Sequence, residues 1–492
     1  MRLFKLRGGV HPEARKADSS ERPIRPLPLP QRLFVPLQQH IGAPARPAVR
    51  VGETVRAGQL VGAGQGSVTA PVHAPASGIV VAIGDHPAPH PSGLPVATVT
   101  IEPDGDDRWF EYEVAADPFA LAPEDIAARA GAAGIVGLGG AAFPSAVKLD
   151  ASRRSGVDTL IINGGECEPY LTCDDRIMRE RAAEIVTGIR LIQRAVGARH
   201  AIVGIEDNKP EALAAMRAAA AATEVRIRAV PAMYPMGWEK QMIQALLGRE
   251  VPAEGRSADI GVLVHNVATA WAVQQALCRG RPLVSRIVTV SGGAVAQPCN
   301  LEVPIGTPVQ ALFDACGGFL STPARLVLGG PMMGHQLAHT GVPVVKGTSG
   351  VLALTQAEIG RAAPAPCIRC SSCVRACPVG LLPLEMAARV RADDLAGAVA
   401  LGLKDCIGCG SCSYVCPSGI PLVHFFSYAK GELAAQARSK AKQEATRKLA
   451  AERSARMERI AREREEAAAA RKAAKAAKEA AARAAEQAEA TA

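Results

Sequence analysis

Two cysteine runs near the end of the chain constrain its fold more than any other feature. Each run has the spacing C-x2-C-x2-C-x3-C followed by proline, and together they contain Cys367, Cys370, Cys373, Cys377, Cys406, Cys409, Cys412 and Cys416. Three thiolates spaced in this way can surround one face of a cuboidal iron–sulfur cluster, while the fourth ligand comes from the other run. The spacing therefore predicts two [4Fe–4S] clusters in an α-helical ferredoxin-like module over residues 360–428.

The crossed arrangement assigns each cysteine to one cluster. We expect the first cluster to be held by Cys367, Cys370, Cys373 and Cys416, and the second by Cys406, Cys409, Cys412 and Cys377. A pair of zinc sites is the alternative, but zinc modules usually contain paired C-x2-C units. Of the remaining cysteines, we expect Cys278, Cys299 and Cys316 to be buried apolar residues, and Cys167 and Cys173 to have no role of their own.

Length and composition limit the class of protein. A chain of 492 residues should form several domains. No apolar run follows the first residues, which predicts the absence of a secretory signal, and thirteen cysteines without such a signal argue against a disulfide framework. The uncharged stretches 130–147 and 260–278 contain glycine, proline or amide residues and do not resemble transmembrane helices. We expect a soluble, intracellular chain.

The net charge of +9 comes mainly from the last segment. Residues 430–492 hold 16 Lys/Arg and 10 Asp/Glu and so supply +6 of it. The segment is rich in Ala, Glu, Lys and Arg and has no proline, which predicts a long charged helix. We expect a basic tail that helps to seat the chain on a membrane complex, with a solvated helix without a task as the alternative, and no nucleic-acid-binding face.

The rest of the chain suggests four further parts. Residues 1–30 are rich in Pro and Arg and resemble an arm, and short β-like runs separated by glycine predict a barrel-sandwich hybrid over 31–115. The turn at 62–73 has no lysine, so a lipoyl-type carrier role is not expected. Residues 120–280 alternate strand and helix patterns, which predicts a doubly wound α/β domain. Residues 285–345 carry β signals with Gly-Gly turns and predict a small β-rich domain.

Two loops in the α/β region favour a ligand site. A glycine-rich loop from Gly134 to Pro144 is followed by Lys148, and glycines allow a backbone to approach a phosphate closely. Asn163–Tyr170 follows a predicted strand, where α/β sheets place their ligand-binding loops. A glycine-rich loop that binds nothing remains the alternative at this point.

These loops resemble a known family. Together with Tyr234–Lys240 and His265–Val267, they are similar to the FMN- and NADH-binding subunit of respiratory complex I. With Gly8–Pro12, the barrel-sandwich segment and the double ferredoxin pattern, the order of parts over about residues 1–430 resembles the C subunits of Rnf (Rsx) ion-translocating electron-transport complexes. The chain departs from the complex I subunit at Leu138 and Gly165, where a basic and an acidic residue would stand.

The resemblance implies cofactors and the residues that bind them. It implies non-covalent FMN, with the candidate residues Gly137, Gly139, Gly140, Phe143, Lys148, Asn163, Glu166 and Glu168. It implies NAD(H) beside the flavin, bordered by Tyr234, Glu239 and Asn266. The 285–345 region would be the ligand-free β-grasp (SLBB) module of the family. No side chain is expected to act as general acid or base, because the cofactors carry the chemistry.

The resemblance also implies partners and a location. We expect membrane subunits of an Rnf-type complex, its other iron–sulfur subunit and a soluble ferredoxin or similar carrier, on the cytoplasmic face of a bacterial inner membrane. Two other readings remain: a soluble flavin/iron–sulfur reductase such as the cobalamin reductases of metabolosomes, and a polyferredoxin relay with a vestigial α/β domain. The ferredoxin module argues against the A subunit of the sodium-pumping quinone reductase.

Overall fold

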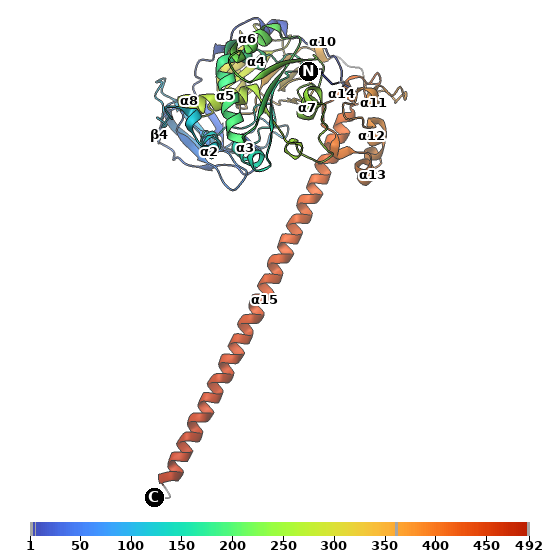
Figure 1. The fold of residues 1–492 in the computed structure, drawn as a ribbon. Helices are drawn as coiled ribbons and strands as arrows, with labels where there is room; N and C mark the ends of the chain where they lie inside the picture. The colour runs from blue at the N-terminus through green and yellow to red at the C-terminus, as the bar shows by residue number, and fades with distance from the viewer. Residues whose placement is uncertain (1–2, 5, 360–362, 490–492) are drawn as a thin grey trace. The chain divides into compact units, whose positions relative to one another are not determined.

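The structure is a computed structural model that describes residues 3–4, 6–359 and 363–489. The chain divides between His424 and Phe425 into two compact units (Figure 1). The predicted N-terminal arm, cysteine module and tail each include positions outside the described residues, namely 1–2 and 5, 360–362, and 490–492. The domain limits given above therefore remain predictions, whereas the predicted classes of structure can be compared with the fold.

A parallel sheet forms the centre of the α/β domain. Its strand order in the described residues is β11-β10-β9-β12, and every neighbouring pair is parallel. The strands are β9 (Thr159–Gly164), β10 (His200–Glu206), β11 (Arg226–Val230) and β12 (Val262–Asn266). Their ends lie within two residues of the strand-like apolar runs that the alternating pattern contains, namely 159–162, 201–205, 225–230 and 260–264. Such near-continuous apolar runs are typical of parallel strands that are buried on both faces.

Alternate side chains of the sheet enter two different cores. Leu160 and Ile162 of β9 belong to a core shared with most of the helices, while Ile161 between them belongs to a second core with Ile243 of α7. Successive side chains of a strand point to opposite faces of the sheet, so helices cover both faces. On the first face α5 packs against α8 (Figure 1). The helices are η1 (Pro118–Ala120), α2 (Pro123–Ala132), α3 (Ser145–Arg154), α4 (Cys173–Glu180), α5 (Ala182–Val196), α6 (Pro210–Ala220), α7 (Glu239–Leu247), η2 (Ser257–Ile260) and α8 (Val267–Arg279).

Two small antiparallel sheets form the predicted barrel-sandwich part. One has the order β2-β8-β7-β4 and the other β3-β5-β6. Val35, Val61, Val80 and Ile101 are fully buried in the core that these strands enclose. The strands are β2 (Leu33–Pro36), β3 (Arg46–Pro47), β4 (Thr54–Val55), β5 (Leu60–Ala63), β6 (Val72–His73), β7 (Gly78–Pro87) and β8 (Pro95–Pro103).

A mixed sheet with the order β1-β14-β13-β17-β15-β16 forms the β-rich domain. It recruits β1 from the N-terminal segment and β17 from beyond residue 345, two pairings that a local sequence pattern does not reveal. Its elements are α1 (Ala17–Ser20), β1 (Arg25–Pro26), β13 (Ser285–Ser291), β14 (Cys299–Pro304), α9 (Val309–Ala315), β15 (Arg325–Leu328), β16 (His335–Gln336), β17 (Gly350–Leu354) and α10 (Gln356–Ile359).

The cysteine module is built from short helices and loops. The segment 384–403, which resembles one helical stretch in the sequence, forms two helices. The break contains Asp393 in the left-handed region, with φ of 57°, and Asp394, whose carboxylate accepts a hydrogen bond from the Gly397 N–H at 2.7 Å. The elements are α11 (Ser372–Ala376), α12 (Pro383–Arg391), α13 (Leu395–Ala400), η3 (Leu403–Asp405) and α14 (Ser411–Tyr414).

The second unit consists of the continuation of helix α15 (Leu422–Glu489). This confirms the predicted long C-terminal helix, and 68 residues correspond to a length of about 100 Å. From Ala434 to Arg459 every side chain is exposed, and the ion pairs Arg459–Glu463 and Lys475–Glu479 each measure 3.9 Å. Alanine content and such i,i+4 pairs favour a solvated helix.

None of the helices in the described residues is long and apolar enough to cross a membrane.

The contact between α5 and α8 gives a test of the packing. A Cβ atom on Gly188 would lie 1.8 Å from the Ala270 carbonyl oxygen. We expect Gly188→Ala to lower the free energy of unfolding by about 3 kcal/mol, because the two helix backbones would have to separate. Gly84→Ala is the matched control, since a Cβ there meets nothing within 4 Å. Equal urea midpoints for the two variants, measured by circular dichroism, would contradict this packing.

Candidate functional site

The strand order places a topological switch point between β9 and β12. The chain continues from β9 to β10 on one side and later returns to β12 on the other side. Open α/β sheets bind ligands outside the carboxyl ends of their strands at such a point. Asn163 and Asn266, two of the predicted site residues, pair directly in register at these carboxyl ends.

The glycine-rich loop lies beside Asn266. The Leu138 N–H donates to the Thr269 hydroxyl in α8 at 2.9 Å, and the Gly137 N–H donates to the Phe143 carbonyl at 2.8 Å, so both ends of the loop are fixed. A Cβ atom on Gly139 would lie 3.4 Å from that of Asn266. Gly140, with φ of 110°, has nothing within 4 Å of its Cβ position. The loop therefore presents exposed backbone without side chains at the switch point.

A buried lysine holds the start of this loop. The Lys346 ammonium donates to the carbonyl oxygens of Gly134 at 2.7 Å and Pro71 at 2.8 Å. Burial lowers the pKa of Lys346 to about 7. Three parts of the chain, namely the β-rich domain, the barrel-sandwich part and the glycine-rich loop, thus meet at one side chain.

Asn163 connects two loops of the site. Its side-chain oxygen accepts from the Gly165 N–H at 2.9 Å, and its side-chain nitrogen donates to the Gly237 carbonyl at 2.7 Å. A Cβ atom on Gly237 would lie 2.3 Å from the Gly165 oxygen, so the two backbones can approach only because residue 237 is glycine.

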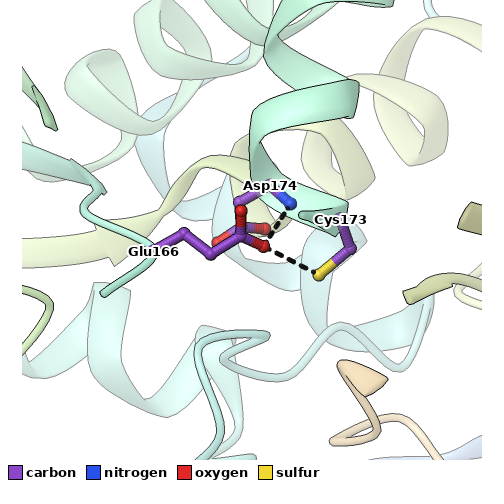
Figure 2. A group of neighbouring side chains, drawn as sticks. All are labelled: Glu166, Cys173 and Asp174. Carbon is purple, nitrogen blue, oxygen red and sulfur yellow. Dashed lines mark hydrogen bonds between the residues drawn. The ribbon is translucent and has the colours of Figure 1, made fainter. Parts of the chain in front are cut away.

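The Glu166 carboxylate caps helix α4. It accepts from the N–H groups of Asp174 at 2.8 Å and Asp175 at 3.3 Å and from the Cys173 thiol at 3.3 Å (Figure 2). The positive end of the helix dipole favours a negative charge at this position. The ligand atoms of Glu166, Cys173 and Asp174 lie within 4.8 Å of one another, but the capping bonds already use the Glu166 carboxylate.

Asp174 is a buried carboxyl group between two site residues. It accepts from the Asn266 side-chain nitrogen at 2.6 Å and lies beside Glu166. Burial and the Glu166 charge raise the pKa of Asp174 to about 7. The Glu166–Asp174 pair therefore holds a proton in weakly acidic solution.

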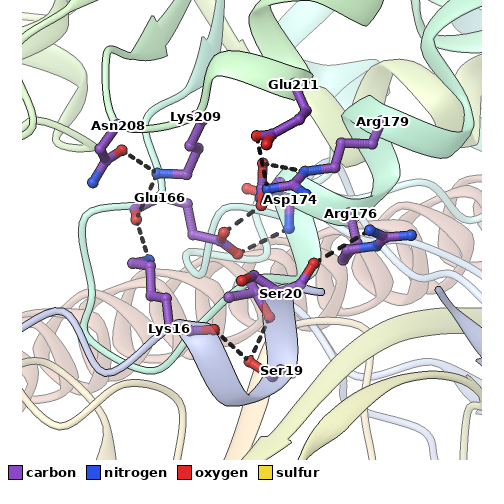
Figure 3. A network of polar contacts seen from close by, with 12 residues as sticks. Lys16, Ser19, Ser20, Glu166, Asp174, Arg176, Arg179, Asn208, Lys209 and Glu211 are labelled. Atoms are coloured by element: carbon purple, nitrogen blue, oxygen red, sulfur yellow. Dashed lines mark hydrogen bonds and ion pairs between the residues drawn. The ribbon is translucent and has the colours of Figure 1, made fainter. Parts of the chain in front are cut away.

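Two lysines, the half-buried Lys16 and the buried Lys209, converge on the main chain of Glu166. Lys16 donates to the Glu166 carbonyl at 2.7 Å and Lys209 does so at 3.5 Å (Figure 3). Lys209 also forms an ion pair with Glu206. Burial lowers the pKa of Lys16. For Lys209, burial opposes the charge, but the carboxylates of Glu206 and Glu166 outweigh it and raise the pKa.

Lys148 and Glu239 form an ion pair at the same edge of the sheet. The Lys148 ammonium lies 3.3 Å from the Glu239 carboxylate and donates to the Val264 carbonyl of β12 at 2.6 Å. Both side chains are partly exposed. The structure thus brings a predicted FMN residue and a predicted NAD(H) residue together.

Glu168 and Tyr234 lie away from the glycine-rich loop. The Glu168 carboxylate accepts from the N–H groups of Met332 at 3.0 Å and Met333 at 2.8 Å, and burial raises its pKa to about 7. The Tyr234 hydroxyl donates to the Cys409 carbonyl at 2.7 Å. Both side chains are therefore engaged with other parts of the chain, and their predicted contacts with flavin and nicotinamide stay predictions.

Some cysteines of each run lie beside a thiol of the other run. Burial and then the thiols of Cys370 and Cys416 raise the pKa of Cys373, so Cys416 lies near the first run. Burial and then the thiols of Cys409, Cys406 and Cys377 raise the pKa of Cys412 to about 12, so Cys377 lies near the second run. The crossed assignment of all eight cysteines to two clusters stays a prediction. We call Cys377, Cys406, Cys409 and Cys412 the inner set, and Cys367, Cys370, Cys373 and Cys416 the outer set.

The two sets differ in their surroundings. Cys409 of the inner set is buried in a cluster with Val10, Tyr234 and Ala376, and the Gly9 N–H donates to the Ala376 carbonyl at 3.0 Å. Cys367 and Cys370 of the outer set are exposed. The inner set thus packs against the α/β domain, and the outer set lies at the surface.

The site residues fit the groups that the sequence implies. The exposed glycines at the switch point suit close approach of a phosphate. The Leu381 N–H points at the Cys377 sulfur at 3.3 Å and the Arg369 N–H at the Cys367 sulfur at 3.4 Å, as expected for sulfur atoms that carry negative charge in a cluster.

Comparisons with protein-family models agree with this architecture. Residues 4–106 match the RnfC barrel sandwich hybrid domain, 131–275 the Nuo51 FMN-binding domain, 287–336 the SLBB domain and 366–420 the 4Fe-4S dicluster domain. The C subunit of an ion-translocating oxidoreductase complex from Rhodobacter capsulatus is 53% identical over 435 residues, covering 88% of this chain and 84% of the relative.

The chain belongs to this family of C subunits. The predicted family and fold class are therefore confirmed, as are the FMN-type and iron–sulfur domains. A second relative in this family, from Pseudomonas aeruginosa, is 47% identical over 93% of this chain and 59% of its own length. A solved structure of a NAD+-reducing [NiFe]-hydrogenase in the H2-reduced state aligns at 22% identity over 65% of this chain and 62% of its own, with a TM-score of 0.45.

The sequence patterns did not indicate several charged side chains that lie in or beside the site. Lys209 follows β10 and Asp174 opens α4, so the rule that ligand loops lie at carboxyl ends of strands could have drawn attention to both. Lys16 and Lys346 carry no such local signal. Each acts through contacts with residues more than a hundred positions away.

The Asp174 pKa predicts a pH dependence of stability. Between about pH 4 and 7 the folded chain holds a proton on this carboxyl that the unfolded chain releases, so this contribution to stability falls as pH rises and is constant above about 7. The free energy of unfolding of the wild type should decrease between pH 5.5 and 7, and we expect Asp174→Asn to remove up to about 2 kcal/mol of this decrease. The exposed Asp85→Asn is the control. If the melting temperatures of wild type and Asp174→Asn change with pH in parallel, the predicted contribution of Asp174 is wrong.

Proposed function

We propose that this protein transfers electrons between NAD(H) and two [4Fe–4S] clusters by way of non-covalent FMN. It would do so in NAD:ferredoxin oxidoreduction, coupled to ion translocation by the partner subunits of a membrane-bound Rnf-type complex. One observation carries the proposal. The loops at the switch point of the α/β sheet continue through Gly237 and Tyr234 directly to the inner cysteine set.

The FMN site would be built on exposed backbone and a nearby cation. Gly139 and Gly140 would supply main-chain N–H groups, Gly137 would hold the loop through its bond to the Phe143 carbonyl, and Lys148 would supply positive charge at the same edge of the sheet. Bound FMN would accept two electrons as a hydride and release them singly. Asn163 and Glu166 fix the opposite loop, and Phe143 closes the glycine-rich loop through its carbonyl.

The NAD(H) side would be formed by Asn266, which lies beside Gly139 of the glycine-rich loop, and Glu239, which pairs with Lys148. Tyr234 would act from below the site, since its hydroxyl is bound to the Cys409 carbonyl. The role of these residues is to position the nicotinamide and to exclude water, because they include no free acid or base in line for proton transfer.

The cysteine sets would hold the clusters in a defined order. Cys409 and Cys412 of the inner set are buried, Cys409 against Tyr234 of the α/β domain, whereas Cys367 and Cys370 of the outer set are exposed, with Arg369 and Arg375 nearby in the chain. This order supports electron exchange with a partner at the outer set. The partner would be the other iron–sulfur subunit or a soluble ferredoxin, on the cytoplasmic face of the inner membrane, where the chain would bind peripherally through the membrane subunits.

The flavin site is tested with Gly139→Asp. The new carboxylate would stand where a phosphate needs the backbone and would repel it, and the added Cβ would fill the space beside Asn266. We expect FMN affinity to fall by about tenfold or more, with about eight iron atoms per chain retained. Gly84→Asp, the same change at an open position, should keep both cofactors. FMN affinity is measured by titration of flavin fluorescence. A wild-type affinity in Gly139→Asp would mean that the phosphate binds elsewhere.

The cluster order is tested with two serine variants. Cys377→Ser should damage the cluster of the inner set, although Cys377 lies in the first run, so that NADH no longer reduces the outer cluster while dithionite still does. Cys370→Ser should damage the outer cluster and leave reduction of the inner one by NADH intact. The readout is electron paramagnetic resonance of reduced samples. Loss of the outer cluster's signal from dithionite-reduced Cys377→Ser would overturn the crossed ligation.

A further inference from the structure

A pair of cysteines in the β-rich domain lies outside the cluster module. The Cys299 and Cys316 sulfur atoms are 3.5 Å apart, although the residues are seventeen positions apart. Cys299 begins strand β14, and Cys316 follows helix α9. The Gln297 N–H donates to the Cys316 carbonyl at 2.9 Å and holds the two segments together. Both side chains are buried in the domain core.

An arginine distinguishes this pair from two inert core thiols. The Arg25 guanidinium donates to the Cys299 sulfur at 3.1 Å and to the Ala315 carbonyl at 3.4 Å. The Cys316 thiol and this guanidinium lower the pKa of Cys299 to about 6, while the pKa of Cys316 is raised by the same sulfur–sulfur contact. Since thiolates and not thiols are nucleophiles, Cys299 is the reactive member of the pair.

Only a short strand with a partly exposed arginine covers the two cysteines. Arg25 is partly exposed and lies in β1, a strand of only two residues at the edge of the sheet. Its register pairs Arg25 with Leu301 and Pro26 with Glu302 of β14. Short edge strands open at low free-energy cost, so a small oxidant can reach the sulfur atoms although they are buried in the closed structure.

We propose that Cys299 and Cys316 form an oxidisable dithiol that a hydroperoxide converts into a disulfide, with Arg25 activating Cys299. The Cys299 thiolate attacks one oxygen of hydrogen peroxide and becomes a sulfenic acid. The O–O bond breaks, and the other oxygen leaves as hydroxide, which takes up the proton that the Cys299 thiol released and gives water. The Cys316 thiol then attacks the sulfenic sulfur, and a second water leaves. Overall, two thiols and one hydrogen peroxide give one disulfide and two water molecules.

The product fits the fold with a small movement. A disulfide requires the sulfur atoms to approach from 3.5 Å to about 2 Å, within the reach of side-chain rotation when the segments already lie side by side. The thiolate that accepts the Arg25 hydrogen bond disappears in the product. Oxidation therefore changes the contact that holds β1 to the β-rich domain.

The sequence allows the reaction to be followed without interference from the clusters. Trypsin releases residues 287–325 as one peptide, because no Lys or Arg lies between Arg286 and Arg325, and this peptide contains both cysteines and no cluster ligand. The full-length protein with its cofactors is treated with a small molar excess of hydrogen peroxide, alkylated, digested and analysed by mass spectrometry. The expected product is an unalkylated peptide two hydrogen atoms lighter than the dithiol, which dithiothreitol reverses.

Further cleavage and an internal reference make the result unambiguous. Cleavage after Glu302 separates the two cysteines, so the halves should stay joined until they are reduced. Cys278, in the tryptic peptide 257–279, has no neighbouring thiol partner among the described contacts and serves as the slow reference. If Cys299 and Cys316 stay alkylatable at a dose that oxidises Cys278, the proposal is wrong.

The part played by Arg25 is tested by its own variant. Arg25→Gln should slow disulfide formation by on the order of tenfold at neutral pH, because the thiolate fraction of Cys299 falls. Arg50→Gln, an exposed arginine in the barrel-sandwich part, is the matched control and should oxidise at the wild-type rate. An unchanged rate in Arg25→Gln would refute the activation of Cys299 by this arginine.

Discussion

Contact between the α/β domain and the cysteine module is the constraint on which the site depends, and the hydrogen bond from the Tyr234 hydroxyl to the Cys409 carbonyl makes this contact directly. Two close backbone approaches that only glycine allows lie beside it. A Cβ atom on Gly237 would lie 2.3 Å from the Gly165 carbonyl oxygen within the α/β domain, and one on Gly8 of the N-terminal segment would lie 2.3 Å from the Cys377 carbonyl oxygen. Redox groups exchange electrons only when little material separates them. Glycine at both positions removes side-chain atoms from the path between the switch point and the inner cysteine set, which a larger residue would lengthen.

The buried charges around Glu166 serve this same contact. The carboxylate is held by the N-terminus of α4, and the carbonyl of the same residue receives Lys16 and Lys209. Because both ends of one residue are fixed by charge-assisted hydrogen bonds, the loop after β9 has little freedom. The lysines donate to the main chain and to Glu206, so their effect on a bound flavin would be exerted through the position of the loop and the local potential.

The sequence predicted the classes of structure well and the side-chain partners poorly. The alternation over 159–266 depends on a local pattern, and the four strands agree with it. Resemblance alone places Glu168 and Tyr234 at the cofactors, and that stays a prediction; their polar atoms bind Met332, Met333 and Cys409, partners that no motif indicates. A motif fixes where a residue stands along the chain, whereas the direction of its side chain depends on domains that pack from elsewhere.

The N-terminal segment shows why composition alone misleads. Its prolines and arginines suggest a free arm, but between Gly8 and Leu27 it contacts three domains in turn. Val10 pairs with Tyr234 of the α/β domain, and Gly9 binds the Ala376 carbonyl of the cysteine module. Farther along, Arg25 and Pro26 add a strand to the β-rich domain.

These contacts all join residues that are distant in sequence, so no local periodicity reports them. A segment without a core of its own can still fix the relative positions of three domains. Each contact orders one stretch of its backbone, and the neighbouring stretch then loses less entropy when it forms the next contact. Proline suits this role because it reduces the conformational entropy that such an extended segment loses on ordering. The same N-terminal segment contacts the cluster around Cys409 through Val10 and places Arg25 beside the Cys299–Cys316 pair, so the proposed electron path and the proposed dithiol share one structural element.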